Sequence, residues 1–478
     1  MRGQVLEALA SEGILLEPDA AEFVLEKQDP VSFTRQALST MEQKPLIVTL
    51  RDLTDGADLA GEETQEEMAE EFPEPSAPRA RGEVKVLRDV TGISCCEGNI
   101  NDFAQYFSDR FRTIKRMLSN RRELAGSVPI SKALKVSRDV RLIGLVNEAH
   151  ATKNGHVMLE LEDEEDRIKV LIPKSSEFIN DSVVNDEVIG VVGNAAQKGD
   201  LVVAEEIIRP DVPLRKAMQP SDSSSAVAFM SDIHLGSNTF LERQWARMME
   251  WLSQEWERQG INYLVIPGDI VDGIGIFPGQ EEELVIDDVF KQYEDLAERL
   301  KEVPDGIQMV VQPGNHDAVR PAEPQPTFSK KITDLFDSSI MFVGNPCYLE
   351  IEERVILSYH GRSMDDLIAG IQSLSYEKPI QAMEEMLRRR HLAPIYGGKT
   401  PIAPEKEDFL TIDRIPDIFV TGHVHGAGVT DYRGVRLINA STWQAQTAYQ
   451  RMHNFNPDPA KLPIVHLGNG RCVMKDFN

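Results

Sequence analysis

Five short apolar segments in the second half of the chain each run directly into a polar motif. Between them, apolar residues recur at helical intervals, and strands that alternate with helices are typical of an α/β domain. In such sheets the loops at the carboxyl ends of the strands share one crevice, so we expect the five motifs to meet at a single site. The motifs occupy residues 231–236, 267–273, 313–317, 359–361 and 421–426.

These motifs carry side chains that transition metals prefer. Half of the ten histidines of the chain lie in them, together with aspartate and asparagine. Imidazole and hard oxygen ligands suit manganese, iron or zinc, and the adjacent glycines let the backbone turn sharply beside an ion. A single motif is a weak signal, because a lone histidine usually has a structural role. Five motifs in series, each after a strand, predict a centre for two metal ions.

Residues 138–215 show a different pattern. Five strand-like runs are separated by turn signals such as Asn154-Gly155. Short strands at this spacing predict a small barrel of the OB type. Such barrels bind single-stranded nucleic acid through aromatic side chains. Because the only aromatic residue between 138 and 212 is Phe178, we expect a structural or docking role for this barrel.

The sequence before the barrel divides into three parts. Residues 1–47 space their apolar side chains as a small helical domain does. Residues 48–84 include nine acidic residues and no basic one between Asp55 and Glu74, which predicts an acidic disordered linker. Residues 85–137 form a helical connector, with an amphipathic helix predicted near 101–120.

The net charge of the chain is −27 at neutral pH, which repels phosphate backbones. A nucleic-acid function would therefore need either a local basic surface or a basic partner. No apolar stretch is long enough for a transmembrane helix, and the first residues lack the pattern of a secretory signal. The four cysteines form no CxxC pair. Together these features predict an intracellular, cytoplasmic protein.

Several further features leave two interpretations open. The basic clusters at 110–116 and 388–391 are either phosphate contacts or solvated helix faces, and the solvated face is the default. Trp443 and Tyr449 either stack on a base or pack in the core. The loop at 277–279 either contacts an unpaired strand end or a partner protein.

The five motifs resemble those of the calcineurin-like metallophosphoesterase superfamily: D-x-H, G-D-x-x-D-G, G-N-H-D, an isolated H and G-H-x-H. The resemblance implies an α/β sandwich at 216–478 that binds two divalent ions, manganese first, with iron, zinc and magnesium as alternatives. It places His316 beside the scissile phosphate, with Asp317 orienting it. The implied ligand set is Asp232, His234 and His425 for one metal, Asn315, His360 and His423 for the other, and Asp269 as the bridge.

A barrel directly before such a domain is similar to the small subunits of replicative DNA polymerases. The filled ligand positions resemble the small subunit of archaeal family D DNA polymerase, as do FMSDIHLGS at 229–237 and QPGNHDAVRPAEPQP at 312–326. That resemblance implies a heterodimer with a large catalytic subunit. It also implies a 3′-to-5′ exonuclease in this chain, which proofreads single-stranded 3′ ends of DNA and supports synthesis by the partner.

Two rival functions remain. One is a non-catalytic scaffold subunit with a vestigial metal site. The other is a phosphatase or phosphodiesterase that does not act on DNA. The intact ligand set argues against the scaffold. The barrel and the close match of the motif sequences argue against the phosphatase.

Overall fold

The computed structural model describes residues 15–16, 24, 34, 47–48, 82–133, 135, 139–196, 201–215, 218–452 and 455–478, and the chain forms two compact units, 1–76 and 77–478. In the first unit β1 (Leu15–Leu16) pairs in parallel with β2 (Ile47–Val48). The helical domain predicted at 1–47 and the linker predicted at 48–84 lie almost entirely outside the described residues. No helix among the described residues is long and apolar enough to cross a membrane.

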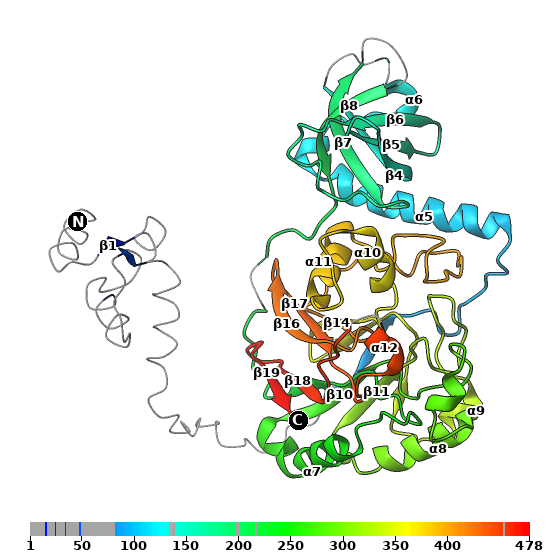
Figure 1. Ribbon diagram of the computed structural model, residues 1–478, viewed down its shortest axis with the longest axis vertical. Helices are drawn as coiled ribbons and strands as arrows, with labels where there is room; N and C mark the ends of the chain where they lie inside the picture. Colours follow the sequence, from blue (N-terminus) through cyan, green and yellow to red (C-terminus); the bar gives the residue numbers. More distant parts are fainter. Residues whose placement is uncertain are drawn as a thin grey trace. The chain divides into compact units, whose positions relative to one another are not determined.

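In the second unit, the five strands predicted between 138 and 215 form a closed barrel in the order β4-β5-β6-β8-β7 (Figure 1). Alternate side chains of these strands point inward, and buried aliphatic residues fill the interior. Phe178 is partly buried and packs against this core. The strands are β4 (Val140–Ala151), β5 (Val157–Glu162), β6 (Arg167–Ile172), β7 (Val188–Ala195) and β8 (Leu201–Ile208).

Helix α5 (Ile100–Ser119) confirms the helix predicted near 101–120. Asn99 caps its first turn, and Asp102 returns the hydrogen bond in a capping box. Its apolar side packs on the barrel. The connector 85–137 is not wholly helical, because it begins with strand β3 (Lys85–Arg88), which pairs with β13 (Cys347–Ile351). A four-residue strand is too short to show a period of its own.

The rest of the second unit contains two six-stranded sheets. The first has the order β12-β11-β10-β9-β18-β19, and its first four strands are parallel. Its strands are β9 (Ala226–Phe229), β10 (Ile261–Pro267), β11 (Gln308–Gln312), β12 (Met341–Phe342), β18 (Lys461–His466) and β19 (Cys472–Asp476).

The second sheet has the order β16-β17-β15-β14-β13-β3, with β14, β15 and β17 parallel. Its remaining strands are β13 (Cys347–Ile351), β14 (Arg354–Ser358), β15 (Ile418–Thr421), β16 (Ala427–Tyr432) and β17 (Val435–Ala440).

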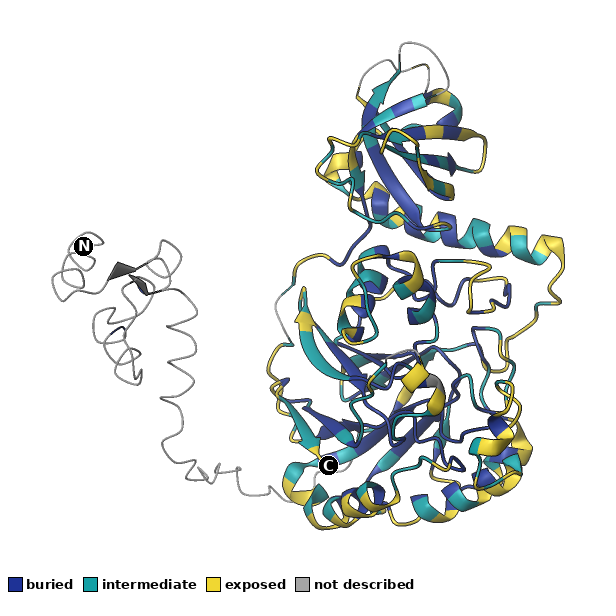
Figure 2. Cartoon of the chain, viewed as in Figure 1, coloured by how far each residue is buried: buried dark blue, intermediate teal, exposed yellow. Residues whose placement is uncertain are grey.

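The two sheets pack face to face, and helices cover both outer faces. Phe229 and Val265 of the first sheet share one buried cluster with Ile356 and Val420 of the second. The outer face of the first sheet packs against α7 (Glu242–Gln259) and α8 (Val289–Leu300), and that of the second against α10 (Met364–Gly370) and α11 (Pro379–Arg389). Figure 2 shows the strands buried and the outer helix surfaces exposed. The chain is thus a mixed α/β structure with a four-layer sandwich and a barrel.

The default interpretation was that both basic clusters are solvated helix faces. Two of their arginines are buried instead. Arg110 is fully buried, and its Nε donates to Asp408 at 2.9 Å. Arg389 is also buried, beside Glu187 of the barrel at 3.1 Å. Because a buried guanidinium needs a carboxylate partner, these arginines join α5 and the barrel to the sandwich. Their partners lie too far away in sequence to be identified from the motif alone.

Candidate metal centre

The polar motifs lie at the carboxyl ends of parallel strands, as predicted. Asp232 and His234 follow β9, and Asp269 follows β10. Asn315 and His316 follow β11. In the second sheet, His360 follows β14, while His423 and His425 follow β15. Both sheets therefore contribute side chains to one edge of the sandwich.

The side chains from these loops converge into three overlapping groups. In each group one ligand atom per residue lies within 4.8 Å of the others. His234 and Asp269 each belong to two groups, so the three groups form one continuous cluster. The groups are Asp232, His234 and His425; His234, Asp269 and His316; and Asp269, His360 and His423.

Asn315 extends the cluster, because its Oδ1 lies 3.1 Å from Nε2 of His360. All seven side chains that the resemblance marks as ligands are thereby brought together. The Nε2 atoms of His234 and His425 face each other at 3.0 Å. Two imidazole nitrogens that point at one position beside the Asp232 carboxylate fit a shared cation well.

The local backbone is unusual at these positions. Asp232, His234, Asp269, His423 and His425 all have φ between 50° and 68°, a region that residues other than glycine rarely adopt. Such conformations cost free energy and concentrate at functional sites. They turn each loop sharply enough to return its side chain toward the strand ends.

Two glycines make room for the carboxylates. A Cβ at Gly314 would collide with the carboxylate of Asp269, and one at Gly422 would collide with that of Asp232. The Asp232 carboxylate instead accepts the N–H of His423, and the Asp269 carboxylate accepts the N–H of His316 at 2.8 Å. These hydrogen bonds fix both carboxylates in place.

Carboxylates and imidazoles shift each other's pKa values in this cluster. Burial raises the pKa of Asp232, but hydrogen bonds to His234 and His425 outweigh it and hold this pKa well below its ordinary value. Burial lowers the pKa of His234 and of His360, but nearby carboxylates outweigh it and raise these values to about 10 and about 9. The buried carboxylates are therefore ionised and attract positive charge, which divalent cations would supply.

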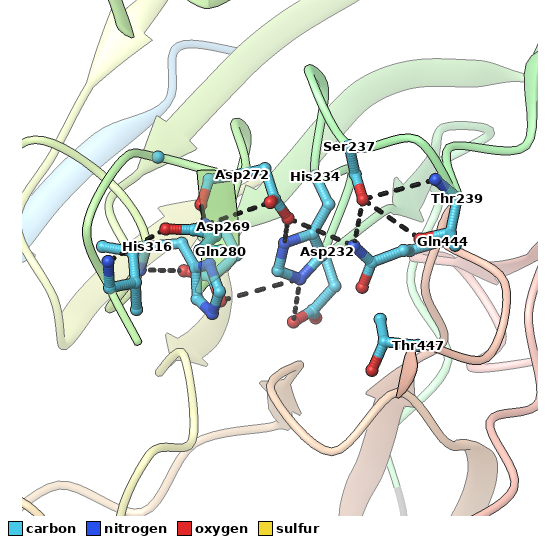
Figure 3. A network of polar contacts seen from close by, with 12 residues as sticks. Asp232, His234, Ser237, Thr239, Asp269, Asp272, Gln280, His316, Gln444 and Thr447 are labelled. Carbon is cyan, nitrogen blue, oxygen red and sulfur yellow. Dashed lines mark hydrogen bonds and ion pairs between the residues drawn. The ribbon is translucent and has the colours of Figure 1, made fainter. Parts of the chain in front are cut away.

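The histidine rings are oriented by their Nδ1 atoms (Figure 3). Nδ1 of His234 lies 3.0 Å from Oδ1 of Asp272. Nδ1 of His360 lies 2.9 Å from the carbonyl oxygen of Pro267, and Nδ1 of His316 lies 2.8 Å from that of Asp272. Each Nδ1–H donates to an oxygen, which leaves Nε2 of each ring for a metal or a substrate.

The contacts of Asp317 differ from the expectation that this residue orients the His316 ring. Its Oδ2 accepts the N–H of Gly314 at 2.8 Å, and its Oδ1 accepts the hydroxyl of Tyr293 at 3.2 Å. Burial and the charge of Asp269 raise the pKa of Asp317 to about 7. No hydrogen bond joins Asp317 to the His316 ring within the described part of the chain. Asp317 braces the turn that carries Asn315, and Asp272 orients His316.

Three further side chains were not identified from the sequence. Gln444 Nε2 donates to Oδ1 of Asp272 at 3.1 Å, and Gln280 Nε2 donates to its Oδ2 at 3.0 Å (Figure 3). The amide of Gln450 lies 2.8 Å from Nδ1 of His425. Asp272 was visible in the second motif, but no pattern marked the glutamines, because glutamine is common in loops of all kinds.

The aromatic candidate at 443 does not face the site. Trp443 is fully buried and packs edge-on against Trp245. The side chain of Tyr449 lies outside the described residues. In the loop at 273–279, Ile274 and Ile276 are exposed, and Gln280 ties this loop to Asp272. Core packing is therefore the role of Trp443.

Comparison with known proteins shows which family the chain belongs to. Residues 227–427 match the family described as the B subunit of DNA polymerase alpha/epsilon. The chain is 43% identical to the DNA polymerase II small subunit of Archaeoglobus fulgidus over 392 residues, which cover 80% of this chain and 79% of that one. It is 38% identical to that of Methanothermobacter thermautotrophicus over 97% of this chain and 98% of the relative. The chain therefore belongs to the family of small subunits of archaeal family D DNA polymerase, also called DNA polymerase II.

Proposed function

We propose that this chain is a metal-dependent 3′-to-5′ exonuclease that removes nucleotides from the 3′ end of DNA within a two-subunit DNA polymerase. The observation that carries the proposal is the position of Asp269. Its carboxylate belongs to two of the groups, one with His234 and His316 from the first sheet and one with His360 and His423 from the second. A bridging carboxylate with a ligand group on each side is the arrangement that two-metal phosphodiesterases require.

The layer order of the sandwich supports the calcineurin-like metallophosphoesterase fold for residues 216–478. Helices cover both outer faces of the paired sheets, and the polar motifs end parallel strands at one edge. The barrel of residues 138–215 has the five strands and the closure of an OB-type domain.

In this proposal, one metal would be held by Asp232, His234 and His425 and the other by Asn315, His360 and His423, and Asp269 would contribute to both sites. Two bound divalent ions, manganese first, would neutralise phosphate charge and lower the pKa of a water molecule for in-line attack. The buried carboxylates and the imidazole Nε2 atoms fit that role, because the ligand atoms of each group lie within 4.8 Å of one another.

His316 acts on the leaving group. Its Nδ1–H is committed to the carbonyl oxygen of Asp272, so Nε2 is the nitrogen that meets the substrate. Burial lowers the pKa of His316, so its ring takes up a proton at Nε2 only when the negatively charged phosphate lies beside it. When water attacks phosphorus and the P–O3′ bond breaks, that proton passes to the departing 3′ oxygen. A nucleoside 5′-monophosphate and a shortened strand with a 3′ hydroxyl result.

The name of the family implies a larger subunit, and we propose that it carries the polymerase site and most of the DNA contacts. A net charge of −27 is consistent with this division, because nonspecific attraction to DNA would then come from the partner. The small subunit would supply the nuclease centre.

The test is degradation of a 5′-labelled single strand by the purified chain with manganese, with and without the large subunit. We expect stepwise shortening from the 3′ end, loss of at least about 100-fold in His316→Ala, and loss in Asp269→Asn. His466→Ala is the matched control, since His466 lies on β18 away from the motifs.

Two outcomes contradict the proposal. Hydrolysis of a phosphopeptide without any cleavage of DNA favours the phosphatase alternative. A folded, manganese-loaded complex that leaves labelled DNA intact favours the scaffold subunit.

A further inference from the structure

Two cationic side chains, those of Arg362 and Lys399, lie beside the proposed metal ligands Asn315, His360 and His423. In the described part of the chain, neither forms an ion pair with a carboxylate. Arg362 follows His360 by two residues, and its Nη1 donates to the carbonyl oxygen of Pro321 at 3.1 Å. Pro321 belongs to the same loop as Asn315 and His316. The guanidinium therefore lies between two of the loops that build the site.

Lys399 approaches the same group from another loop. Asp365 lies 3.5 Å from Nε2 of His423, and its neighbour Asp366 accepts the backbone N–H groups of Lys399 and Thr400. The loop that carries Lys399 is thereby fixed next to His423, and its side chain is exposed.

The acidic groups around these cations are engaged elsewhere. Asp365 accepts the hydroxyl of Tyr376 besides contacting His423, and Asp366 is used by two backbone donors. Glu323 is buried and accepts the hydroxyl of Tyr359 at 2.7 Å. Within the described ranges, no ion pair joins a carboxylate to the side chain of Arg362 or Lys399. Glu323 attracts Arg362 and Asp365 attracts Lys399 only over longer distances.

The contrast with nearby Arg320 is informative. Arg320 belongs to the loop that follows His316, but its Nη2 pairs with the buried carboxylate of Glu405 at 2.8 Å. Its Nη1 also donates to Ser94. Arg320 therefore has a structural role, whereas Arg362 keeps donors for a ligand.

We propose that Arg362 and Lys399 bind the backbone phosphate adjacent to the scissile one, and so guide a single strand into the site. The proposal rests on the function proposed above and adds the residues that hold the strand. A guanidinium suits two phosphate oxygens, and an ammonium acts as a point charge. In a chain of strongly negative charge, two cations without acidic partners at the site would provide the local basic surface that strand binding requires.

The salt dependence of strand binding tests this role. The probe is a 5′-labelled single strand with phosphorothioate linkages at its 3′ end, bound to the full complex with its large subunit. For single strands, each phosphate contact contributes about 0.7 to the slope of log Kd against log salt concentration. Because both cations are proposed to neutralise one phosphate, we expect the double variant to reduce the slope by about 0.7, and Arg362→Ala and Lys399→Ala each by part of that amount.

Charge-conserving and remote variants separate this role from a structural one. Arg362→Lys and Lys399→Arg should keep the wild-type slope. Arg258→Ala and Lys301→Ala remove the same charges near the carboxyl ends of α7 and α8, at the opposite edge of the first sheet, and should leave the slope unchanged. Hydrolysis of bis(p-nitrophenyl) phosphate, which has no adjacent phosphate, should stay within about twofold of wild type in all of them.

The inference fails if the Arg362 and Lys399 variants keep the wild-type slope, or if they lose hydrolysis of the small diester as severely as that of DNA. Failure of the proposed function looks different, because the wild-type complex would then cleave neither DNA nor the small diester.

Discussion

Asp232 and Asp269 illustrate how much the site depends on conformations that few residues adopt. Both have positive φ, and both lie against glycines whose missing side chains leave room for the carboxylates. A left-handed residue other than glycine costs of order 1–3 kcal/mol, so several in one site need firm support from their surroundings. Burial and hydrogen bonds to backbone N–H groups supply that support.

Gly314 offers a direct test of this crowding. In Gly314→Ala the added methyl group would displace the Asp269 carboxylate, and a misplacement of about 1 Å costs roughly 100-fold in activity. Nuclease assays with manganese should show that loss, and the melting temperature should fall as well, because the added Cβ would also lie 2.6 Å from the backbone nitrogen of Asp269. Gly370→Ala is the control, because a Cβ there makes only an ordinary contact with Ile395. Equal activity of both variants would contradict the argument.

Asp272 contacts a proposed metal ligand, His234, and also His316, the residue proposed to act on the leaving group. Its carboxylate contacts His234, and its carbonyl oxygen contacts His316. In Asp272→Asn the backbone contact stays while the carboxylate–imidazole pair weakens, so we expect about 10- to 100-fold weaker manganese affinity or activity. Titration of activity with manganese measures it. Unchanged manganese dependence would show that His234 needs no such partner.

At the scale of elements, the connection of α5 to the sandwich depends on buried charges. Asp408 accepts hydrogen bonds from Arg110 and from His391 at 2.7 Å, and all three are buried. Burial raises the pKa of Asp408, but His391 and Arg110 outweigh it and hold this pKa well below its usual range. Burial lowers the pKa of His391, and Arg110 lowers it further.

This cluster makes stability depend on pH with a defined sign. The unfolded chain binds protons at Asp408 near pH 3.9 and at His391 near pH 6.5, above the folded pKa values. Stability from these groups is therefore full above those values and declines as pH falls through them. The difference in unfolding free energy between wild type and Asp408→Asn should shrink below about pH 4. Denaturant titrations measure it, and a difference that grows on acidification would contradict the sign.

The local features of these elements were predictable, and their long-range partners were not. The strands before the motifs, the five barrel strands and α5 follow from periodicity within one segment. Arg110 and Asp408 are 298 residues apart, and Arg389 pairs with Glu187 of the barrel, so no local pattern predicts either pair. The same limit applies to Gln444 and Gln450, because the segment that carries them contains no motif.

At the scale of the whole molecule, the two sheets act together. Asp232 and Asp269 come from the first sheet, whereas His360 and His423 come from the second, so neither sheet holds a complete site. The aliphatic cluster between the sheets sets their relative position and thereby the spacing of the ligands. The packing of the two sheets therefore determines whether the candidate metal site can form.

Anomalous X-ray diffraction from manganese-soaked crystals tests the central claim most directly. We expect two peaks about 4 Å apart, with Asp269 between them. One peak should lie within coordination distance of Asp232, His234 and His425, and the other within that of Asn315, His360 and His423. Well-ordered crystals that show no peak there, or a single ion bound by neither group, would contradict the account.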